Sequence, residues 1–382
     1  MGTLYQMDIL QEILTSLRSE DRVMLVTIIS TNGSTPASAL SKMLVRERGK
    51  QWLGTVGGGC VEGDVLEQAI RLYAEGTAKI LTFQLNETNI DQGLICGGSL
   101  DVLIEPLSKR EIAVFQEMKS IRDDGDDCVL ITFISAGGNI GGKYCVNMRW
   151  ERKDGIMEWW RRTEGLRDNE VDLVFDAITG AVAKAHRRNE TQRIALQGGE
   201  LILEPVKGLP DLIIFGGGHV SKYISRAAAM TGFRVTVIDD RPEYANAERF
   251  PEAERTIAVD FLDALQRVEI KASTYIVIVT RGHRSDEEIL SRVIGSAARY
   301  IGMIGSQRKV LTTYEHMVDH GVSVESLKRI HAPIGLEIGA ATAEEIGISV
   351  VAQLIAVRRG GAEKQENKSD SMKKLIAQMT RI

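Results

Sequence analysis

Short apolar runs alternate with amphipathic stretches between residues 210 and 360. Each apolar run ends at a glycine or a polar cluster, and the stretches between the runs repeat apolar residues at helical spacing. This alternation predicts a parallel sheet flanked by helices, because strands buried on both faces read as continuous apolar runs. A capping box, Thr342 with Glu345, begins the last predicted helix. The clearest runs are DLIIFGGGHV (211–220), FRVTVIDDR (233–241), TYIVIVTRGH (274–283) and RYIGMIGS (299–306).

The first half of the chain is predicted to form a second α/β domain with a less regular order of elements. Residues 23–30 form an apolar run typical of a buried strand, and residues 42–56 indicate a hairpin. Apolar positions from Val65 onward indicate an amphipathic helix that ends near Gly76. Residues 110–190 are harder to assign, and no internal repeat is visible in the sequence.

The change between the two patterns sets the expected domain limits. A segment with glycines and two prolines precedes the regular half, and such segments commonly join domains. We therefore expect an α/β protein: an N-terminal α/β domain over residues 1–190, a linker over 191–210, a Rossmann-like C-terminal domain with a parallel sheet over 211–360, and a mobile tail over 361–382.

Composition and charge narrow the class of protein. Of the 382 residues, 43% are hydrophobic and 26% are charged, which is ordinary for soluble domains. A net charge of −5 argues against a nucleic-acid surface. No apolar run approaches the roughly 20 residues of a membrane span and no signal peptide is visible, so we expect a cytoplasmic protein without a membrane partner. Four cysteines without Cys-x-x-Cys spacing favour neither a disulfide framework nor a structural zinc site. Cys128 and Cys145 fall within strand patterns and are expected to be buried as small apolar residues.

The other two cysteines lie among glycines, in VGGGCVEGD around Cys60 and in ICGGSLD around Cys96. Cys60 is predicted to begin a helix, whose dipole stabilises a thiolate that can act as a nucleophile or as a soft-metal ligand. Glu62 and Asp64 oppose this effect by adding negative charge. The alternative is a tight turn in which cysteine is a small apolar filler. Residues without side chains would let a bulky ligand reach each sulfur: Gly57, Gly58 and Gly59 before Cys60, and Gly97 and Gly98 after Cys96.

A glycine turn follows the first strand of the second domain, at Gly216 and Gly218. In a Rossmann unit, glycines at these positions shape the turn and let a pyrophosphate approach the helix N-terminus. Asp239 ends the next strand, where a carboxylate can bind a ribose hydroxyl. The third glycine of the pattern is replaced by Ser221, and the ring of His219 crowds the place of a pyrophosphate. The turn predicts a Rossmann-like fold and leaves open whether a dinucleotide binds.

Basic residues also follow the strands of this domain, and the carboxyl ends of parallel strands meet at one edge of a sheet. A cationic edge suits a phosphate group, although each basic residue alone is an ordinary surface charge. His316 and His320, four residues apart on a predicted helix, lack a carboxylate motif and are expected on a surface. The residues that share the edge are Arg241, Arg281, His283, Arg308 and Lys309.

Seven blocks of the sequence together resemble the XdhC/CoxI family, the xanthine dehydrogenase accessory factors, in the order of that family. The resemblance is weakest over residues 110–190. It implies an N-terminal domain of the XdhC type, a Rossmann domain, and a maturation factor rather than a metabolic enzyme. The blocks are GSTPASALSKMLV, GTVGGGCVEGDVLEQA, LICGGSLDVLIEP, LIIFGGGHVSKYI, VTVIDDRPEYAN, YIGMIGSQRK and IHAPIGLEIGAATAEEIGISVVAQLIA.

The resemblance further implies that the chain binds molybdenum cofactor, as molybdopterin or its dinucleotide form. Its partners would be a cysteine desulfurase, which supplies the sulfido ligand, and a xanthine dehydrogenase-type molybdoenzyme, which receives the cofactor. Cys60 and Cys96 would approach the molybdenum, and a homodimer is favoured. Two alternatives stay open: an NAD(P)-dependent oxidoreductase that uses the glycine turn, and a nucleotidyl- or sulfur-transfer enzyme that acts on the cofactor. The Rossmann residues implicated in cofactor binding are Gly216, Gly218, His219, Asp239, Arg241, Arg281 and His283.

Overall fold

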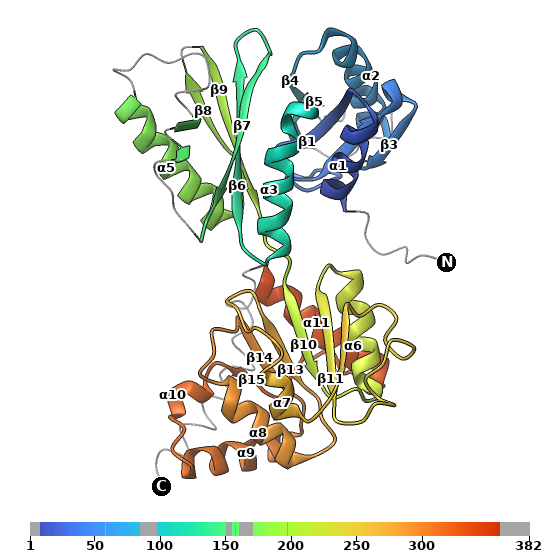
Figure 1. Ribbon diagram of the computed structural model, residues 1–382, viewed down its shortest axis with the longest axis vertical. Helices are drawn as coiled ribbons and strands as arrows, with labels where there is room; N and C mark the ends of the chain where they lie inside the picture. Colours follow the sequence, from blue (N-terminus) through green and yellow to red (C-terminus); the bar gives the residue numbers. More distant parts are fainter. Residues whose placement is uncertain are drawn as a thin grey trace. The chain divides into compact units, whose positions relative to one another are not determined.

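A computed structural model describes residues 8–57, 59–84, 98–149, 155–156, 158–159, 171–196 and 198–359 of the chain. The chain forms two compact units, one over Met7–Gly208 and one from Leu209 onward (Figure 1). The predicted tail over 361–382 lies outside the described residues. No helix in the described part of the chain combines the length and the apolar surface that crossing a bilayer requires.

The first sheet of the N-terminal unit is antiparallel, with strand order β3-β2-β1-β5-β4. The predicted hairpin is confirmed: β2 and β3 pair across a short 3-10 turn at Glu47–Gly49. One face of the sheet packs against α1 and the other against α2. The elements are α1 (Ile9–Ser19), β1 (Arg22–Asn32), β2 (Lys42–Arg46), β3 (Gln51–Gly54), α2 (Gly59–Glu75), β4 (Lys79–Gln84) and β5 (Ser99–Ser108).

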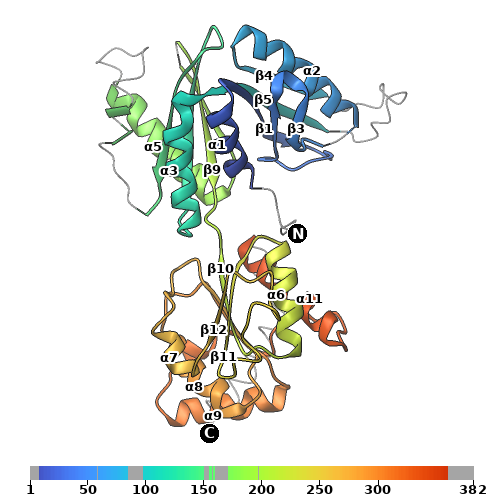
Figure 2. The same cartoon turned by 45° about the vertical axis from the view of Figure 1, so that its right-hand side comes forward.

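The second sheet is also antiparallel, with strand order β7-β6-β9-β8. Helix α5 covers its outer face, and α3 packs beside α1 near the other face (Figures 1 and 2). The predicted burial of Cys128 and Cys145, on β6 and β7, is confirmed, since they are 0% and 2% exposed. The elements are α3 (Ile112–Asp123), β6 (Cys128–Ser135), β7 (Ile140–Asn147), α5 (Val171–Arg188), β8 (Gln192–Leu196) and β9 (Gly199–Val206).

The predicted linker over residues 191–210 was wrong, because most of this segment forms the β8–β9 hairpin of the second sheet. Its glycines make the turn: Leu196 pairs with Gly199, and residues 197–198 connect the two strands. Pro205 lies within β9, opposite Val129 of β6. The chain passes to the second unit only after Gly208. Glycine and proline therefore mark a hairpin here rather than a domain connection.

The two sheets of the N-terminal unit repeat one topology, which the sequence analysis missed. The order α1-β1-β2-α2-β4-β5 recurs as α3-β6-β7-α5-β8-β9, and the strand order β2-β1-β5-β4 recurs as β7-β6-β9-β8. The register recurs as well: Thr27 faces Lys42 as Thr132 faces Lys143. The matching segments are identical at four of six positions in LVTIIS (25–30) and LITFIS (130–135), and at two of six in VLIEPL (102–107) and LILEPV (201–206).

Two buried ion pairs join the sheets and reproduce each other. Lys42 Nζ lies 2.7 Å from Glu204 Oε2, and Lys143 Nζ lies 2.7 Å from Glu105 Oε2. Each half thus gives its lysine to the other half's glutamate, as expected for an approximate two-fold relation between the halves. Burial raises the pKa of Glu105, while the charge of Lys143 opposes that rise. Each lysine also donates to a threonine of the adjacent strand, Thr27 at 2.9 Å and Thr132 at 2.7 Å.

The C-terminal unit is a Rossmann-like fold, as predicted. Its six strands are parallel in the order β12-β11-β10-β13-β14-β15. Successive strands are added toward one edge from β10 to β12 and toward the other edge from β13 to β15, so the strand order reverses between β10 and β13. The strands are β10 (Asp211–Phe215), β11 (Arg234–Asp239), β12 (Arg255–Ala258), β13 (Tyr275–Ile278), β14 (Tyr300–Met303) and β15 (Ile330–His331).

Helices cover both faces of this sheet. Two of them pack side by side on one face (Figure 2), and three pack on the other. The predicted capping box at Thr342 and Glu345 is confirmed at the start of α11. The first pair is α6 (His219–Met230) and α11 (Ala343–Arg358); the others are α7 (Phe261–Leu265), α8 (His283–Val293) and α9 (Gln307–Asp319), with the short α10 (Val324–Leu327) following.

Candidate functional site

The glycine turn between β10 and α6 is held tightly by the protein itself. Gly216 has φ of +105°, and a Cβ there would lie 2.4 Å from the carbonyl oxygen of Val279. A Cβ on Gly217 would lie 2.1 Å from the carbonyl oxygen of Tyr244. Gly218, the N-cap of α6, has no neighbouring atom within 4 Å of an added Cβ. Packing therefore requires the first two glycines, and only the third leaves the helix N-terminus open.

Asp239, the predicted ribose ligand, is 1% exposed and already fully engaged. Its Oδ2 accepts a hydrogen bond from the Gly217 N–H at 2.8 Å, and its Oδ1 accepts one from the Arg241 N–H at 3.1 Å. The Arg241 guanidinium donates to both oxygens, at 2.8 and 3.1 Å. Burial acts to raise the pKa of Asp239, but these bonds outweigh it and lower the pKa. A ribose hydroxyl would have to share oxygens that the protein already uses.

The other basic residues near the glycine turn are also paired. Arg281, which follows β13, reaches Asp240, which follows β11, with Nη2 to Oδ2 at 3.1 Å. Since β10 lies between those two strands, this ion pair spans the end of β10, where the glycine turn begins. Arg241 stacks on the Tyr244 ring with Cζ 3.6 Å from its centroid. His219, the exposed first residue of α6, contacts only the ring of Tyr223 among the described aromatic rings.

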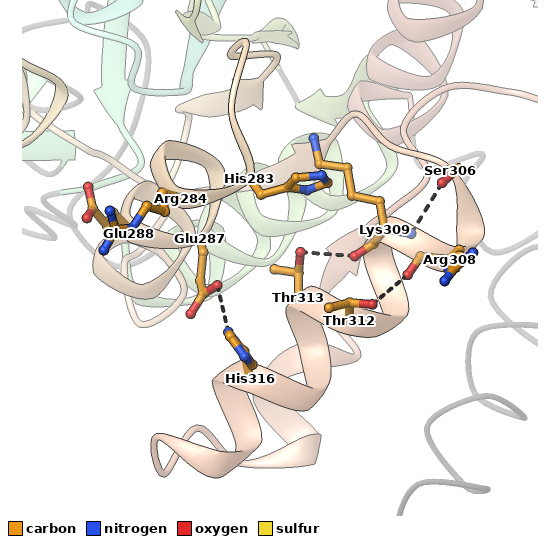
Figure 3. A pocket seen from close by; sticks show the side chains of 10 residues that line it. All are labelled: His283, Arg284, Glu287, Glu288, Ser306, Arg308, Lys309, Thr312, Thr313 and His316. Atoms are coloured by element: carbon orange, nitrogen blue, oxygen red, sulfur yellow. Dashed lines mark hydrogen bonds and ion pairs between the residues drawn. The ribbon is translucent and has the colours of Figure 1, made fainter.

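A cavity of about 600 Å³ lies beyond the ion pair, where α8 and α9 begin (Figure 3). Its volume is typical of sites for small molecules. The structure thus brings together His283, predicted from the end of β13, with Arg308 and Lys309, predicted from the end of β14. The remaining lining residues are Arg284, Glu287, Glu288, Ser306, Thr312, Thr313 and His316.

Sequence reasoning missed most of the residues that α8 and α9 give to this cavity. His316, expected on a plain helix surface, lines the cavity with its Nδ1 3.5 Å from Glu287 Oε2. A usable signal was present: the first turns of helices that follow parallel strands lie at the same edge as the strand ends. A search that covered the first helical turn after each strand, as well as the residues at the strand end, would have included Arg284 and Glu287.

The cysteine site of the N-terminal unit is only partly described. Cys96 lies outside the described residues, as do Gly58, Gly97 and the side chain of Cys60. Helix α2 begins at Gly59, which confirms that Cys60 stands at the start of a helix. Among the described residues, no group of three or more His, Cys, Asp or Glu side chains is arranged to hold a metal ion.

The described ends of the two cysteine segments contact the same loop, between β1 and β2. Gly57 has φ of +125°, and a Cβ there would lie 2.9 Å from Cγ of Pro36. A Cβ on Gly98 would lie 2.4 Å from the carbonyl oxygen of Ser34. Residues 34–36 therefore approach both segments, one three residues before its cysteine and the other two residues after. Glycine is needed at both places because the loop leaves no room for a side chain.

Comparison with known proteins identifies two matching family models. The XdhC Rossmann domain matches residues 212–354, and the XdhC and CoxI family model matches residues 16–84. The chain belongs to the XdhC/CoxI family. The first match covers the glycine turn with its cationic edge. The second runs through β1 to the end of β4 and includes Cys60, whereas Cys96 lies outside both matches.

Curated relatives of this family member match nearly the whole chain. A protein of Bacillus subtilis strain 168, named as a probable xanthine dehydrogenase subunit, is 24% identical over 348 residues, which is 90% of this chain and 95% of that protein. "Molybdenum cofactor insertion chaperone PaoD" from Escherichia coli K12 is 21% identical over 345 residues, 90% of this chain and 86% of its own. A solved structure described as a xanthine dehydrogenase from Bacillus halodurans has a TM-score of 0.69 at 24% identity, over 93% and 96% of the two chains, and establishes the fold.

Proposed function

We propose that this protein is an accessory factor that binds molybdenum cofactor, supports its sulfuration and inserts it into a xanthine dehydrogenase-type molybdoenzyme. The observation that carries the proposal is the loop at residues 34–36, which contacts the described ends of both glycine-flanked cysteine segments. Two segments held by one loop can act on one ligand. The relative named as a molybdenum cofactor insertion chaperone supports the choice of that ligand.

The cofactor is cargo in this scheme, and the protein contributes ligands and shielding. Cys60 and Cys96 supply soft thiolates suited to a molybdenum centre. Gly58, Gly59 and Gly97 carry no side chains that would keep a pterin away from the sulfurs. A cysteine desulfurase then provides the sulfur that becomes the sulfido ligand of the molybdenum. The proposal includes a cytoplasmic setting and a homodimer, and light scattering on the purified protein tests the dimer.

Cofactor retention tests the proposal directly. The reduced protein is mixed anaerobically with molybdenum cofactor and desalted, and molybdenum and pterin are measured per chain. Wild type should retain both, and Cys60→Ser or Cys96→Ser should lose most of them. Cys128→Ala is the matched control, because it removes a thiol buried in the second sheet. Absence of retention by wild type would contradict the carrier role, and full retention by both serine variants would exclude the thiols.

An NAD(P)-dependent oxidoreductase is the second candidate, favoured by the Rossmann strand order and the open backbone at Gly218. The contacts of Asp239 and the ion pair of Arg281 weigh against it, because they occupy groups that a dinucleotide would need. Calorimetric titration with NADH and NADPH decides between the candidates. Saturable binding that Gly218→Val abolishes would favour the oxidoreductase, and no heat at millimolar nucleotide would exclude it.

A further inference from the structure

The cavity between α8 and α9 differs from the glycine turn in being open to a ligand. At the turn, the Asp239 carboxylate accepts hydrogen bonds from Arg241, and the ion pair of Arg281 with Asp240 spans the end of β10. The cavity lies on the other side of the point where the strand order reverses, and it is lined by the helices that follow β13 and β14. Open parallel sheets bind ligands at this edge. The cavity described at this edge therefore lies in the half beside β14.

The ammonium group of Lys309, in the wall of the cavity, is held in place by a buried carboxylate. Lys309 Nζ forms an ion pair with Asp286, whose carboxylate is 0% exposed. The same carboxylate accepts a hydrogen bond from the Thr280 hydroxyl at 2.6 Å. A lysine held by a buried carboxylate loses little rotamer entropy when a ligand arrives, because it is already ordered. Lys309 is thus a pre-organised donor in the wall of the cavity, which His283 also lines (Figure 3).

The rest of the cavity is polarised along its length. Helix α8 starts at Gly282 without a side-chain cap, so the N–H groups of its first turn are available to an anion. Arg308 lies in the first turn of α9, and no hydrogen bond or ion pair holds its guanidinium within the described part of the chain. At the other end lie the carboxylates of Glu287 and Glu288 together with the guanidinium of Arg284, and His316 is beside Glu287 (Figure 3).

This polarity selects a ligand with an anion at one end and hydrogen-bond donors at the other. A phosphate matches Arg308, Lys309 and the uncapped N-terminus of α8. Carboxylates are acceptors only, so Glu287 and Glu288 repel a second phosphate and accept from hydroxyl or amino groups. A nucleotide has this distribution of groups, since its ribose hydroxyls lie a few ångströms from its 5′-phosphate. Inorganic phosphate would satisfy only the basic end.

We propose that the α8–α9 cavity binds a nucleotide, with its phosphate at Arg308 and Lys309 and its ribose hydroxyls at Glu287. The inference rests on the proposed function in one respect, because it assigns the nucleotide half of a dinucleotide form of the cofactor to this cavity. It also separates the cavity from the glycine turn, which the ion pair between Arg281 and Asp240 keeps for the protein's own contacts.

Isothermal titration calorimetry of the full chain tests the assignment. The probes are cytidine, adenosine and guanosine 5′-monophosphates and inorganic phosphate. Arg308→Gln should weaken the binding of every probe about tenfold, or about 1.4 kcal/mol. Glu287→Gln should weaken the nucleotides and leave phosphate unchanged or tighter. The controls are Arg292→Gln, an exposed arginine at the far end of α8, and Arg281→Gln beside the glycine turn; both should bind like wild type.

The outcomes separate this inference from the carrier role. No nucleotide binding at millimolar concentration, or nucleotides that bind no better than phosphate, would overturn the assignment. Binding lost in Arg281→Gln and kept in Arg308→Gln would move the nucleotide to the glycine turn and also overturn it. A wild type that retains molybdenum and pterin but binds no nucleotide leaves the carrier role standing without this site. Nucleotide binding that depends on Arg308, in a protein that retains no cofactor, would support the cavity and contradict the carrier role.

Discussion

Replacing Lys143 with methionine should strongly destabilise the N-terminal unit, because Glu105 would then be buried between the sheets without its counter-charge. The side chains of Lys143 and Glu105 are 1% and 3% exposed, with 2.7 Å between nitrogen and oxygen. Removing one partner of such a pair costs about 3–5 kcal/mol. The equivalent side chains of Lys42 and Glu204 are 15% and 9% exposed. Lys42→Met should therefore cost less, since water reaches the carboxylate left behind.

Tryptophan fluorescence during urea unfolding measures this loss without interference from the other unit. A loss of about 3–5 kcal/mol at a urea slope of about 2 kcal/mol/M lowers the midpoint by about 1.5–2.5 M. The double variant K143M/E105L removes both charges and should recover most of the loss, because two apolar side chains need no counter-charge. The four tryptophans, which all belong to the N-terminal unit, are Trp52, Trp150, Trp159 and Trp160.

The pH dependence of the same variant gives a second readout. Burial raises the pKa of Glu105 from its ordinary value of 4.5, and Lys143 is the largest opposing influence. Without Lys143 the pKa in the folded state should rise further, so the folded state binds more protons than the unfolded one above pH 4.5. The difference in the free energy of unfolding between wild type and Lys143→Met should therefore shrink as pH falls toward 4.5 and grow as pH rises. A deficit that is equal at about pH 5 and about pH 8, or a wild-type midpoint, would refute the reasoning.

Two further predictions concern the C-terminal unit and are measured by urea unfolding with far-UV circular dichroism. Gly217→Ala puts a Cβ 2.1 Å from the Tyr244 carbonyl oxygen and should cost about 1–3 kcal/mol; an unchanged midpoint would contradict the packing argument. Burial lowers the pKa of His331 from 6.5 to about 4, so the unfolded state binds more protons between these values. The unit should therefore lose up to about 3 kcal/mol as pH falls through this range. Glutamine at position 331 cannot titrate, so His331→Gln should flatten the dependence of stability on pH. A pH dependence like that of wild type would show that His331 does not cause the loss.

The centre of the C-terminal sheet is readable from the sequence and its edges are not. β10, β11, β13 and β14 coincide with the continuous apolar runs, because these strands are buried on both faces. The edge strands show no such apolar run, because only Ile257 of β12 is buried and β15 has two residues. Only their pairing with β11 and β14 defines them as strands.

The same distinction applies to the candidate site. Topology alone gathers Arg241, Arg281 and His283 at one edge, because they follow strands that run in parallel. Whether each basic residue is free for a ligand depends on which carboxylate its side chain reaches. Arg241 turns back onto Asp239 and Arg281 reaches Asp240. Lys309 pairs with Asp286, whereas Arg308 has no such partner in the described part of the chain, and no strand pattern contains these directions. The sequence therefore predicts the edge, and the structure distinguishes its closed half from its open half.

The duplication in the N-terminal unit explains how one half could acquire a function while the other keeps only the fold. Residues 85–98 join β4 to β5, whereas residues 197–198 alone join their counterparts β8 and β9. Both hairpins hold the same place in the same strand order, so the fold does not require the long connection. That connection contains Cys96. We therefore propose that the long connection serves the cofactor binding put forward above.

Exchanging the connections tests this explanation. Replacing residues 85–98 with Gln-Gly, the turn of the second half, should leave the urea midpoint of the tryptophan signal near that of wild type, because a shorter loop costs less entropy to close. The same variant should lose molybdenum and pterin at least as fully as Cys96→Ser in the unshortened chain. A large fall in the midpoint would make the connection structural. A folded variant that still retains its full complement of cofactor would remove both Cys96 and its connection from cargo binding, and would leave Cys60 to act there without it.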